Sequence, residues 1–361
     1  MKILILANFD VGLYKFRKEL IQELINKGNK VIISLPYGEM VEPLKKMGCE
    51  FIDTNVDRRG INPVKDVSLI KAYYSIIKQV KPDMVITYTI KPNIYGGLVC
   101  RLTKTSYAAN ITGLGTAFQK KGLLKSFVTW LYKISLKKAK VVFFENSENR
   151  QIFINSKIID ETQTCLLNGA GVNLEEYSYL EYPKDENPIR FLFIGRVMKE
   201  KGINELFEAM KMLRKDDINC VLDVVGGYEE DYKEIIQKYE NEGWLFYHGF
   251  QRDVRPFIAK CHCFVLPSWH EGMANTNLEC AASGRPIITS NIHGCKEAAI
   301  DGQTGFLCEK QDVQSLYKAM KRMIQLNNEE RNYMGMQGRE YMEKVFDKTM
   351  VVRRTIDYLY R

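Results

Sequence analysis

The chain of 361 residues has no long apolar run, only four histidines and no Gly-x-Gly-x-x-Gly sequence. No segment approaches the roughly 18 consecutive apolar residues of a membrane-spanning helix, so we expect none. The missing glycine pattern argues against a dinucleotide-dependent dehydrogenase. The first residues form an expected strand and lack the basic and apolar regions of a signal peptide, which favours a protein of the cytoplasm.

The sequence also lacks a cysteine framework. Its nine cysteines are an odd number and are scattered among expected strands and helices, which is typical of reduced thiols in the cytoplasm. Cys261-His262-Cys263 invites a metal interpretation, but no second Cys/His pair has the spacing of a zinc site. We therefore expect these residues to pack in the core, and we predict no metal site.

What the sequence does have is an alternation of strand and helix patterns in two sets. Expected strands are residues 2–9, 30–36, 49–54, 84–89, 106–112 and 141–146, then 189–195, 220–226, 245–250, 263–268 and 286–290. Expected helices are residues 16–27, 40–47, 67–80, 95–104 and 119–140, then 204–215, 231–242, 254–260, 276–283 and 350–361. This order predicts an α/β fold with two parallel, doubly wound sheets. The polar stretch 175–188 contains two prolines and no apolar periodicity, so we expect a linker there.

The most informative segment follows the expected strand 263–268. Glu271 lies at the carboxyl end of that strand, where open α/β sheets bind ligands. A helix is expected next, with Asn275 or Thr276 as N-cap, so backbone N–H groups near its start form an anion site. Glu279 would point from the first turn into the same crevice. Carboxylates accept hydrogen bonds from hydroxyl groups in pairs, which suits a polyol.

A second group follows the expected strand 189–195. It contains Gly195, Arg196, Lys201 and Gly202, and the two cations suit two phosphates and the charge of a leaving group. Taken alone, either the acidic pair or the basic pair is as well explained by solvated surface charges. Together, each after an expected strand, they indicate a site for a sugar attached to a diphosphate.

These motifs resemble the family 4 retaining glycosyltransferases of GT-B fold, in the branch that builds bacterial capsule, O-antigen or lipid-linked oligosaccharides. The resemblance extends over essentially the whole chain. Its segments are Gly195-Arg196 with Lys201-Gly202, Glu271 with Glu279, 284–288, 294–297, 301–306, 88–98 and 110–118. It implies two Rossmann-like domains facing each other across a cleft: 1–174 for the acceptor and 175–344 for the nucleotide sugar. The final helix, about 345–361, would pack back onto the first domain.

The resemblance also implies roles. A hexose or N-acetylhexosamine would move from a nucleotide sugar, with UDP expected, to an undecaprenyl-diphosphate-linked saccharide, with retained configuration and without metal or other cofactor. Arg196 and Lys201 would hold the diphosphate, Glu271 would orient the donor sugar, and Glu279 would bind the ribose. The expected donor contacts also include Gly195, Gly272, Met273, Ala274, Asn275 and, beside the base, Phe250.

Two positions depart from the family pattern. Many relatives have a glycine pair after the first strand, whereas this chain offers only Gly12 as a donor contact. Many relatives also carry a histidine near the reacting sugar in the first domain, but all four histidines here follow residue 247. Lys91 lies in the neighbouring segment and is expected to bind donor or acceptor instead; a solvated loop lysine is the alternative.

The positive charge is concentrated in the first half. Through residue 180 there are 26 Lys+Arg against 16 Asp+Glu, whereas the whole chain has 52 against 44. No nucleic-acid motif accompanies this charge, so an anionic membrane surface is the expected partner. The best candidate is a basic amphipathic helix at about 120–140, with Leu123, Leu124, Phe127, Trp130, Leu131 and Ile134 at helical spacing among lysines. The alternative is that this stripe packs on the sheet and the lysines are solvated. We expect a protein peripheral to the inner face of the plasma membrane.

Two other functions remain open at this point. A nucleotide-sugar 2-epimerase has the same two-domain architecture and phosphate chemistry but needs no acceptor. A non-catalytic sugar-binding protein would have the same site without turnover. The sequence alone does not identify the donor sugar, the acceptor linkage or the pathway.

Overall fold

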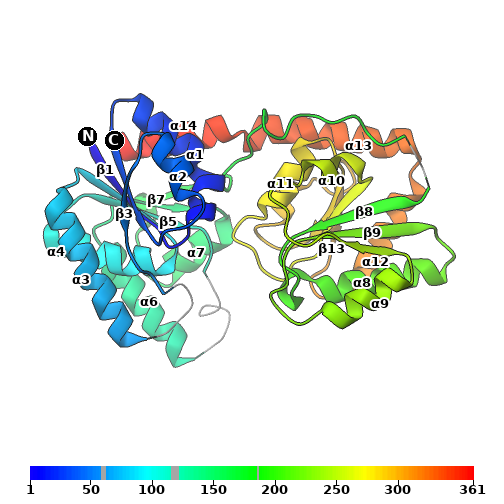
Figure 1. Ribbon diagram of the computed structural model, residues 1–361, viewed down its shortest axis with the longest axis horizontal. Coiled ribbons are helices and arrows are strands. Elements are labelled where there is room, and N and C mark those ends of the chain that lie inside the picture. The colour runs from blue at the N-terminus through cyan, green and yellow to red at the C-terminus, as the bar shows by residue number, and fades with distance from the viewer. Residues whose placement is uncertain (58–61, 115–121, 185–186) are drawn as a thin grey trace. The chain divides into compact units, whose positions relative to one another are not determined.

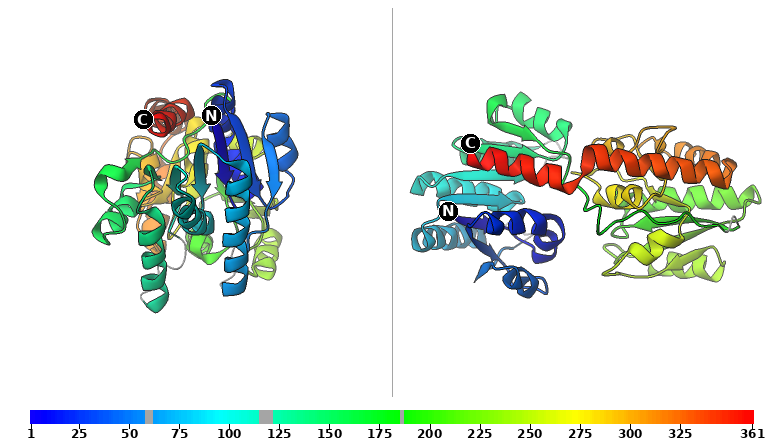
Figure 2. Two further views of the ribbon diagram at one scale, coloured as in Figure 1. Left: turned by 90° about the vertical axis from the view of Figure 1, so that its left-hand side faces the viewer. Right: turned by 90° about the horizontal axis from the view of Figure 1, so that it is seen from above.

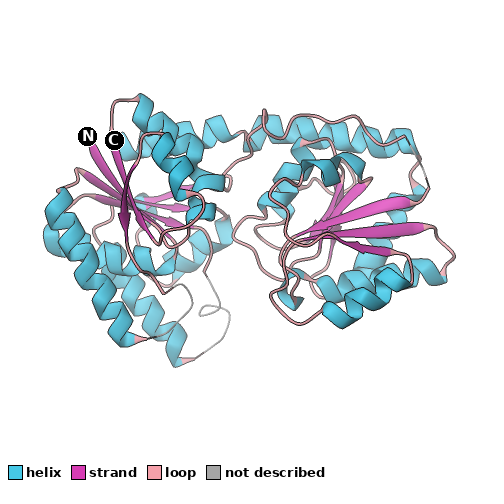
Figure 3. Cartoon of the chain, viewed as in Figure 1, coloured by secondary structure: helices cyan, strands magenta, loops and turns pink. Residues whose placement is uncertain are grey.

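The computed structural model describes residues 1–57, 62–114, 122–184 and 187–361 (Figure 1). The chain divides into two compact units. The N-terminal unit comprises Met1–Ala170 with Thr349–Arg361, and the C-terminal unit comprises Gly171–Lys348. Within each unit, helices cover both faces of a sheet of parallel strands (Figure 3). The predicted α/β class with two doubly wound sheets is confirmed.

The N-terminal unit has a sheet in the order β3-β2-β1-β4-β5-β6-β7. Its strands are β1 Lys2–Leu6, β2 Lys30–Leu35, β3 Glu50–Asp53, β4 Met84–Tyr88, β5 Tyr107–Ile111, β6 Val141–Phe144 and β7 Thr164–Leu166. Its helices are α1 Asp10–Asn26, α2 Val41–Lys46, α3 Pro63–Val80, α4 Gly97–Thr103, α6 Leu123–Leu136 and α7 Ser147–Asn155, with a π-helical turn Pro92–Gly96 before α4. β1 and β4 are adjacent although β2 and β3 lie between them in sequence, so the strand order reverses at this pair.

The C-terminal unit has a sheet in the order β10-β9-β8-β11-β12-β13. Its strands are β8 Ile189–Ile194, β9 Cys220–Val225, β10 Leu245–Tyr247, β11 Cys263–Leu266, β12 Ile287–Ser290 and β13 Gly305–Cys308. Its helices are α8 Ile203–Lys215, α9 Lys233–Asn241, α10 Arg255–Lys260, α11 Asn275–Ala282, α12 Val313–Gln325 and α13 Asn328–Tyr341, which continues as a π-helical turn Met342–Phe346. Here the order reverses between β8 and β11.

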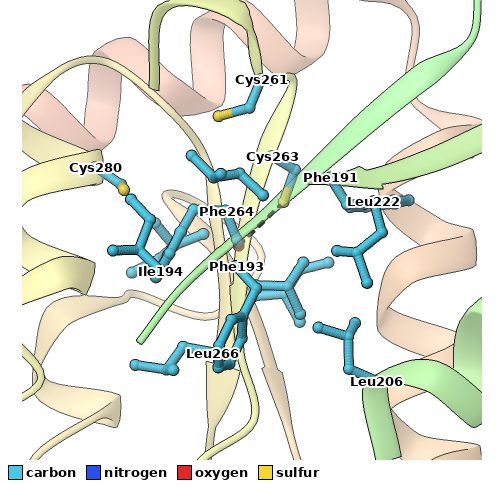
Figure 4. Close-up of a cluster of buried hydrophobic side chains, with 14 of the residues drawn as sticks. Phe191, Phe193, Ile194, Leu206, Leu222, Cys261, Cys263, Phe264, Leu266 and Cys280 are labelled. Atoms are coloured by element: carbon cyan, nitrogen blue, oxygen red, sulfur yellow. Dashed lines mark hydrogen bonds between the residues drawn. The ribbon is translucent and has the colours of Figure 1, made fainter. Parts of the chain in front are cut away.

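The central strands are apolar on both faces because helices cover both sides of the sheet. In β8, Phe191, Leu192 and Phe193 are completely buried, and they pack with residues of β9 and β11 in one core (Figure 4). Cys261 and Cys263 belong to the same core, and burial raises the pKa of the Cys261 thiol to about 12. The predicted packing role of these cysteines therefore agrees with their position.

Several element boundaries differ from the sequence prediction. α1 begins at Asp10, well before the predicted residue 16, because Leu13 in its first turns is already buried against the sheet. α7, α12, α13, β7 and β13 were not predicted at all. Parts of two predicted features, residues 115–118 of the family segment and Lys120 with Lys121 of the basic helix, lie outside the described residues.

The prediction of a linker at 175–188 is wrong. The boundary lies at Ala170–Gly171 instead of 174–175, and the described part of 175–188 packs on the C-terminal unit. The buried guanidinium of Arg285 donates to the carbonyl oxygens of Leu180, at 3.0 Å, and Glu181, at 2.8 Å. The hydroxyl of Tyr182 donates to the carbonyl oxygen of His262 at 2.7 Å. These contacts hold a segment that has no apolar periodicity of its own.

The final helix α14, Lys348–Tyr360, packs on the N-terminal unit (Figure 2). The amide of Asn29 donates to the hydroxyl of Tyr360 at 2.5 Å, and Lys140 donates to the carbonyl oxygen of Leu359 at 2.9 Å. Among the described residues, no helix combines the length and the apolar character needed to cross a bilayer.

Two glycines of α13 provide a test of this packing. A Cβ added at Gly335 would lie 2.1 Å from the carbonyl oxygen of Gly284, whereas one at Gly338 would have 3.8 Å to its nearest neighbour. Gly335→Ala is expected to lower the free energy of unfolding by about 1–3 kcal/mol through overpacking. Gly338→Ala should leave it unchanged or raise it by up to about 1 kcal/mol, since alanine favours helix. Urea denaturation measures both, and equal effects of the two substitutions would contradict this packing.

Candidate active site

The candidate site lies at the carboxyl edge of the C-terminal sheet, where the strand order reverses. β8 and β11 are adjacent and parallel, so the loops that follow them begin side by side. The loop after β8 carries Arg196 and Lys201, and the loop after β11 carries Glu271. Ligands of open α/β sheets bind at this kind of position. The fold thus brings together two of the predicted groups that are far apart in sequence.

Lys201 and Glu271 form a direct ion pair. The ammonium of Lys201 donates to Oε1 of Glu271, and the hydroxyl of Ser268 donates to the same oxygen at 2.8 Å. The side chains of Lys201 and Glu271 are only 19% and 12% exposed, so the pair is largely shielded from water. Burial raises the pKa of the adjacent Cys295 thiol well above its usual value, and the negative charge of Glu271 adds to the increase. Ser268 is not among the predicted site residues, although it ends the apolar run before Glu271.

Two glycines allow this pair to form. Gly202 has a φ of +73°, and a Cβ there would lie 2.0 Å from the carbonyl oxygen of Pro267. Gly294 has a φ of +89°, and a Cβ there would lie 2.7 Å from the carbonyl oxygen of Glu271. Any larger residue would push the loops apart. Gly202 and Gly294 of the family motifs therefore act here through close backbone approach.

The start of α11 differs from the prediction. The helix begins at Asn275, and Ala274 is the N-cap without a side-chain hydrogen bond, so the prediction of Asn275 or Thr276 as N-cap is wrong. The N–H of Ala274 donates to the carbonyl oxygen of Gly294 at 2.7 Å, which removes it from the predicted set of free donors. The N–H groups of Asn275 and Thr276 have no acceptor among the described residues, and Oδ1 of Asn275 is buried without a partner. The two N–H groups suit an anion at the helix N-terminus, whereas the amide oxygen of Asn275 can only accept a hydrogen bond, for example from a ligand hydroxyl.

The other predicted donor contacts are less well placed to bind a substrate. Met273 is 6% exposed and its side chain belongs to the core. Gly272 lies beside Glu271 against the loop that contains Gly294. The N–H of Gly195 donates to the carbonyl oxygen of Val225 at 2.9 Å, so Gly195 serves the end of β8 with its N–H group.

Glu279 lies one turn into α11 and is 4% exposed. Tyr177 makes a side-chain hydrogen bond to it. Burial raises the pKa of Tyr177, and the charge of Glu279 and this hydrogen bond raise it further. Tyr177 was missed by the sequence analysis because it lies in the segment that was taken as a linker.

Arg196 and Phe250 are the exposed members of the predicted set. Arg196 pairs with Glu229 at 3.3 Å, but its side chain is 52% exposed and can rearrange at low cost. Phe250 follows Gly249 after β10 and is 71% exposed. An exposed aromatic ring at the same edge of the sheet offers a stacking surface for a base.

Gly12 and Lys91 belong to the N-terminal unit. Gly12 lies in the first turn of α1, directly after β1. Lys91 pairs with Asp66 at 2.7 Å, and the two side chains are 14% and 16% exposed. The same carboxylate accepts from the hydroxyl of Tyr95 at 2.9 Å. Lys91 is therefore not a solvated loop lysine, and its charge is balanced by Asp66.

The next feature is the placement of the side chains that can bind a metal. Within the described ranges, no three His, Cys, Asp or Glu residues form a group suited to a metal ion. Nδ1 of His262 accepts the N–H of Arg190 at 3.0 Å, so this imidazole has a structural partner.

With the geometry in place, comparison with known proteins identifies the class. Residues 2–146 match the family model of glycosyl transferase 4-like proteins, and residues 180–341 match that of glycosyl transferases group 1. The chain belongs to these glycosyltransferases, and it is an enzyme of that class with the GT-B fold.

Two relatives and one solved structure show how far the similarity extends along the chain. The chain is 28% identical over 90% of its length, and 90% of the relative, to the N,N'-diacetylbacillosaminyl-diphospho-undecaprenol alpha-1,3-N-acetylgalactosaminyltransferase of Campylobacter jejuni. It is 27% identical over 73% of its length, and 72% of the relative, to the UDP-Gal:alpha-D-GlcNAc-diphosphoundecaprenol alpha-1,3-galactosyltransferase of Escherichia coli. Among solved structures, Anabaena Alr3699/HepE in complex with UDP-glucose superposes with a TM-score of 0.81 at 16% identity, covering 100% of this chain and 99% of that one.

The role of the close contact at Gly294 can be tested through its effect on catalysis. Gly294→Ala should displace Glu271 and lower kcat/KM for glycosyl transfer at least about tenfold, as small misplacements of catalytic groups do. Gly302→Ala is the matched control, because Gly302 also has a positive φ of +76° but a Cβ there would meet none of the described residues within 4 Å. Both variants should lose similar backbone stability. Transfer kinetics at a temperature where both remain folded measure the difference, and equal activity of the two variants would contradict the role of Gly294.

Proposed function

We propose that this glycosyltransferase moves a hexose or N-acetylhexosamine from a UDP-sugar to an undecaprenyl-diphosphate-linked saccharide. The observation that carries the proposal is the shielded Lys201–Glu271 pair beside the free N–H groups of α11. A cation and a helix N-terminus suit a diphosphate, and a carboxylate suits the hydroxyls of the attached sugar. The names of the two relatives supply the acceptor class, and the name of the Escherichia coli relative supplies UDP.

The roles of the side chains follow from their chemistry. Lys201 and Arg196 bind the diphosphate and stabilise the charge that develops when the bond from the anomeric carbon to the phosphate oxygen breaks. Glu271 exchanges its contact with Lys201 for hydroxyls of the donor sugar. Glu279, held by Tyr177, accepts from the ribose hydroxyls, and Phe250 stacks on the base. Two cations and a helix N-terminus neutralise the leaving group, so we propose transfer without a divalent metal.

We also propose that the anomeric configuration is retained. Both relatives are named as alpha-1,3-transferases, and the donor in one name is UDP-Gal. UDP-hexoses of this kind carry an α-linked sugar, so an α product requires net retention. The same outcome here would be visible by NMR in the coupling constant of the newly linked anomeric proton.

The central test is an assay of purified protein with UDP-GalNAc, UDP-GlcNAc or UDP-Gal and an undecaprenyl-diphosphate-linked saccharide. One donor is expected to give an elongated lipid-linked product, and EDTA should leave the rate unchanged. Lys201→Met should weaken UDP binding about ten- to a hundredfold, since a charge-assisted hydrogen bond is lost. Glu271→Gln should lower transfer on the order of a hundredfold. UDP binding by Glu271→Gln should equal or exceed that of the wild type, because Lys201 loses its competing partner.

Two outcomes would contradict this function, and a third would contradict its mechanism. Formation of an epimer from the donor alone would indicate an epimerase, and an unchanged rate in both variants would remove the site from the chemistry. Loss of transfer in EDTA with recovery in magnesium would overturn the metal-independent mechanism.

We further propose that the enzyme works at the anionic inner face of the plasma membrane, where α6 contacts lipid. α6 has two faces: Tyr132 and Leu136 are buried, whereas Phe127 and Trp130 are each 55% exposed. The two exposed rings stack at 6.2 Å between centroids, and exposed Lys133, Lys137 and Lys138 follow them. Aromatic rings with neighbouring lysines suit a lipid interface. The side chains of Leu123 and Leu124 lie outside the described part of the chain.

The membrane proposal has its own test. A variant with both Phe127→Ser and Trp130→Ser should bind vesicles of phosphatidylglycerol at least about tenfold more weakly than the wild type in co-sedimentation, while its melting temperature and its activity on a water-soluble acceptor stay the same. Leu102→Ser is the control, because Leu102 is 72% exposed in the same unit but lies outside α6. Equal vesicle binding by the double variant and the wild type would show that the two rings do not contact lipid.

A further inference from the structure

The N-terminal unit has its own reversal of strand order, between β1 and β4. The last paired residues are Leu6 and Thr87, and two positions beyond them lie Asn8 and Thr89. These two residues therefore occupy the place at which open α/β sheets bind ligands. Oδ1 of Asn8 and Oγ1 of Thr89 are both buried, and neither has a hydrogen-bond partner among the described residues. Buried polar atoms without partners are rare and costly, so a pair of them at this position requires an explanation.

Thr89 is also held in an unfavourable backbone conformation. Its φ is +72°, a left-handed value that is a genuine outlier for a β-branched residue. Such strain persists only where the surrounding structure enforces it, and it gathers at functional sites. Here the carbonyl oxygen of Thr89 accepts the N–H of Asn93 at 3.0 Å, which starts the π-helical turn.

A buried network fixes that turn to the sheet. The hydroxyl of Thr87 donates to Oδ1 of Asn93 at 2.6 Å, and Nδ2 of Asn93 donates to the carbonyl oxygen of Asn110 at 2.8 Å. Lys91 and Tyr95, which flank Asn93, both bind the carboxylate of Asp66. All of these side chains make hydrogen bonds or ion pairs that hold the segment in place. The hydroxyl of Thr89 makes no such contact with the described residues.

The chemistry of the unpaired atoms indicates the ligand. The amide oxygen of Asn8 can accept a hydrogen bond, the hydroxyl of Thr89 can accept or donate one, and both are uncharged, which suits the hydroxyl group of a saccharide. The amide oxygen of Asn8 would repel an anion. Of the described cations nearby, Lys91 and Arg17 are paired with Asp66 at 2.7 Å and with Glu145 at 2.5 Å.

We propose that Asn8 and Thr89 form a subsite for a saccharide hydroxyl, and that Lys91 is a positioning residue that acts through the turn. This subsite rests on the proposed function and deepens it, because it assigns a sugar contact to uncharged side chains of the N-terminal unit. The hydroxyl belongs either to the donor sugar or to the acceptor saccharide, which share this chemistry.

Thr89→Val tests the subsite because valine keeps the shape and the backbone strain of threonine and removes only the hydroxyl. We expect an unchanged melting temperature, unchanged UDP affinity and a KM raised at least about tenfold for one sugar substrate. If the KM for the donor rises, the bound hydroxyl belongs to the donor sugar. If the KM for the acceptor rises, it belongs to the acceptor saccharide. Thr89→Ser should restore the wild-type KM, and Asn8→Ala should raise the same KM. Lys91→Met should raise that KM with kcat kept, and Lys91→Arg should restore it.

Thr105→Val is the matched control, since Thr105 precedes β5 at the opposite edge of the same sheet. Both KM values within twofold of the wild type in Thr89→Val and Asn8→Ala would overturn the subsite while the transferase function stands. A wild-type enzyme without transfer would instead overturn the proposed function. In that case the subsite can still be tested by binding alone, with calorimetry that compares UDP-GalNAc with UDP and with NMR of a methyl N-acetylhexosaminide. Sugar binding that is weaker in Thr89→Val than in the wild type supports the subsite. Equal sugar binding, or none in either protein, overturns it.

Discussion

The site depends on how closely the backbone can approach itself at the carboxyl edge of the C-terminal sheet. Gly202 lies against the carbonyl oxygen of Pro267, and Gly294 lies against that of Glu271, in both cases nearer than any Cβ would permit. These contacts bring the loop after β8 onto the loop after β11, and the ion pair of Lys201 and Glu271 follows from them. Glycine and charge in the motifs therefore have separate tasks: the glycines close the distance, and the charged side chains occupy the space that remains.

Much of the fold could be predicted from the sequence because buried parallel strands are continuous apolar runs, which can be recognised locally. The meeting of Lys201 with Glu271 could be anticipated for a related reason: each follows such a strand, and the carboxyl ends of parallel strands share an edge. Helix boundaries could be predicted less well from the sequence. The start of α11 is set by a hydrogen bond from Ala274 to Gly294, a contact between two loops that no local pattern contains.

The failures have a common physical origin in long-range partners of polar groups. The segment 175–188 resembles a linker by composition, yet Arg285, about a hundred residues later, binds its carbonyl oxygens. Tyr177 in that segment becomes the partner of Glu279 for the same reason. Lys91 lies in the segment that the family pattern indicates, but its partner Asp66 belongs to a different helix. Composition indicates which residues are polar, and only the fold decides which of them are already paired.

The two units place different chemistry at equivalent positions of equivalent sheets. At the reversal between β8 and β11 the C-terminal unit presents charged side chains and a helix N-terminus, which suit a diphosphate. At the reversal between β1 and β4 the N-terminal unit presents the uncharged Asn8 and Thr89, and Lys91, two residues further along the chain, is paired with Asp66. A leaving diphosphate needs positive charge fixed where its negative charge develops, whereas a sugar hydroxyl needs a fixed donor or acceptor without net charge. Strain at Thr89 and close glycine contacts at Glu271 are thus two solutions to one requirement, which is to hold a polar group rigidly before its ligand arrives.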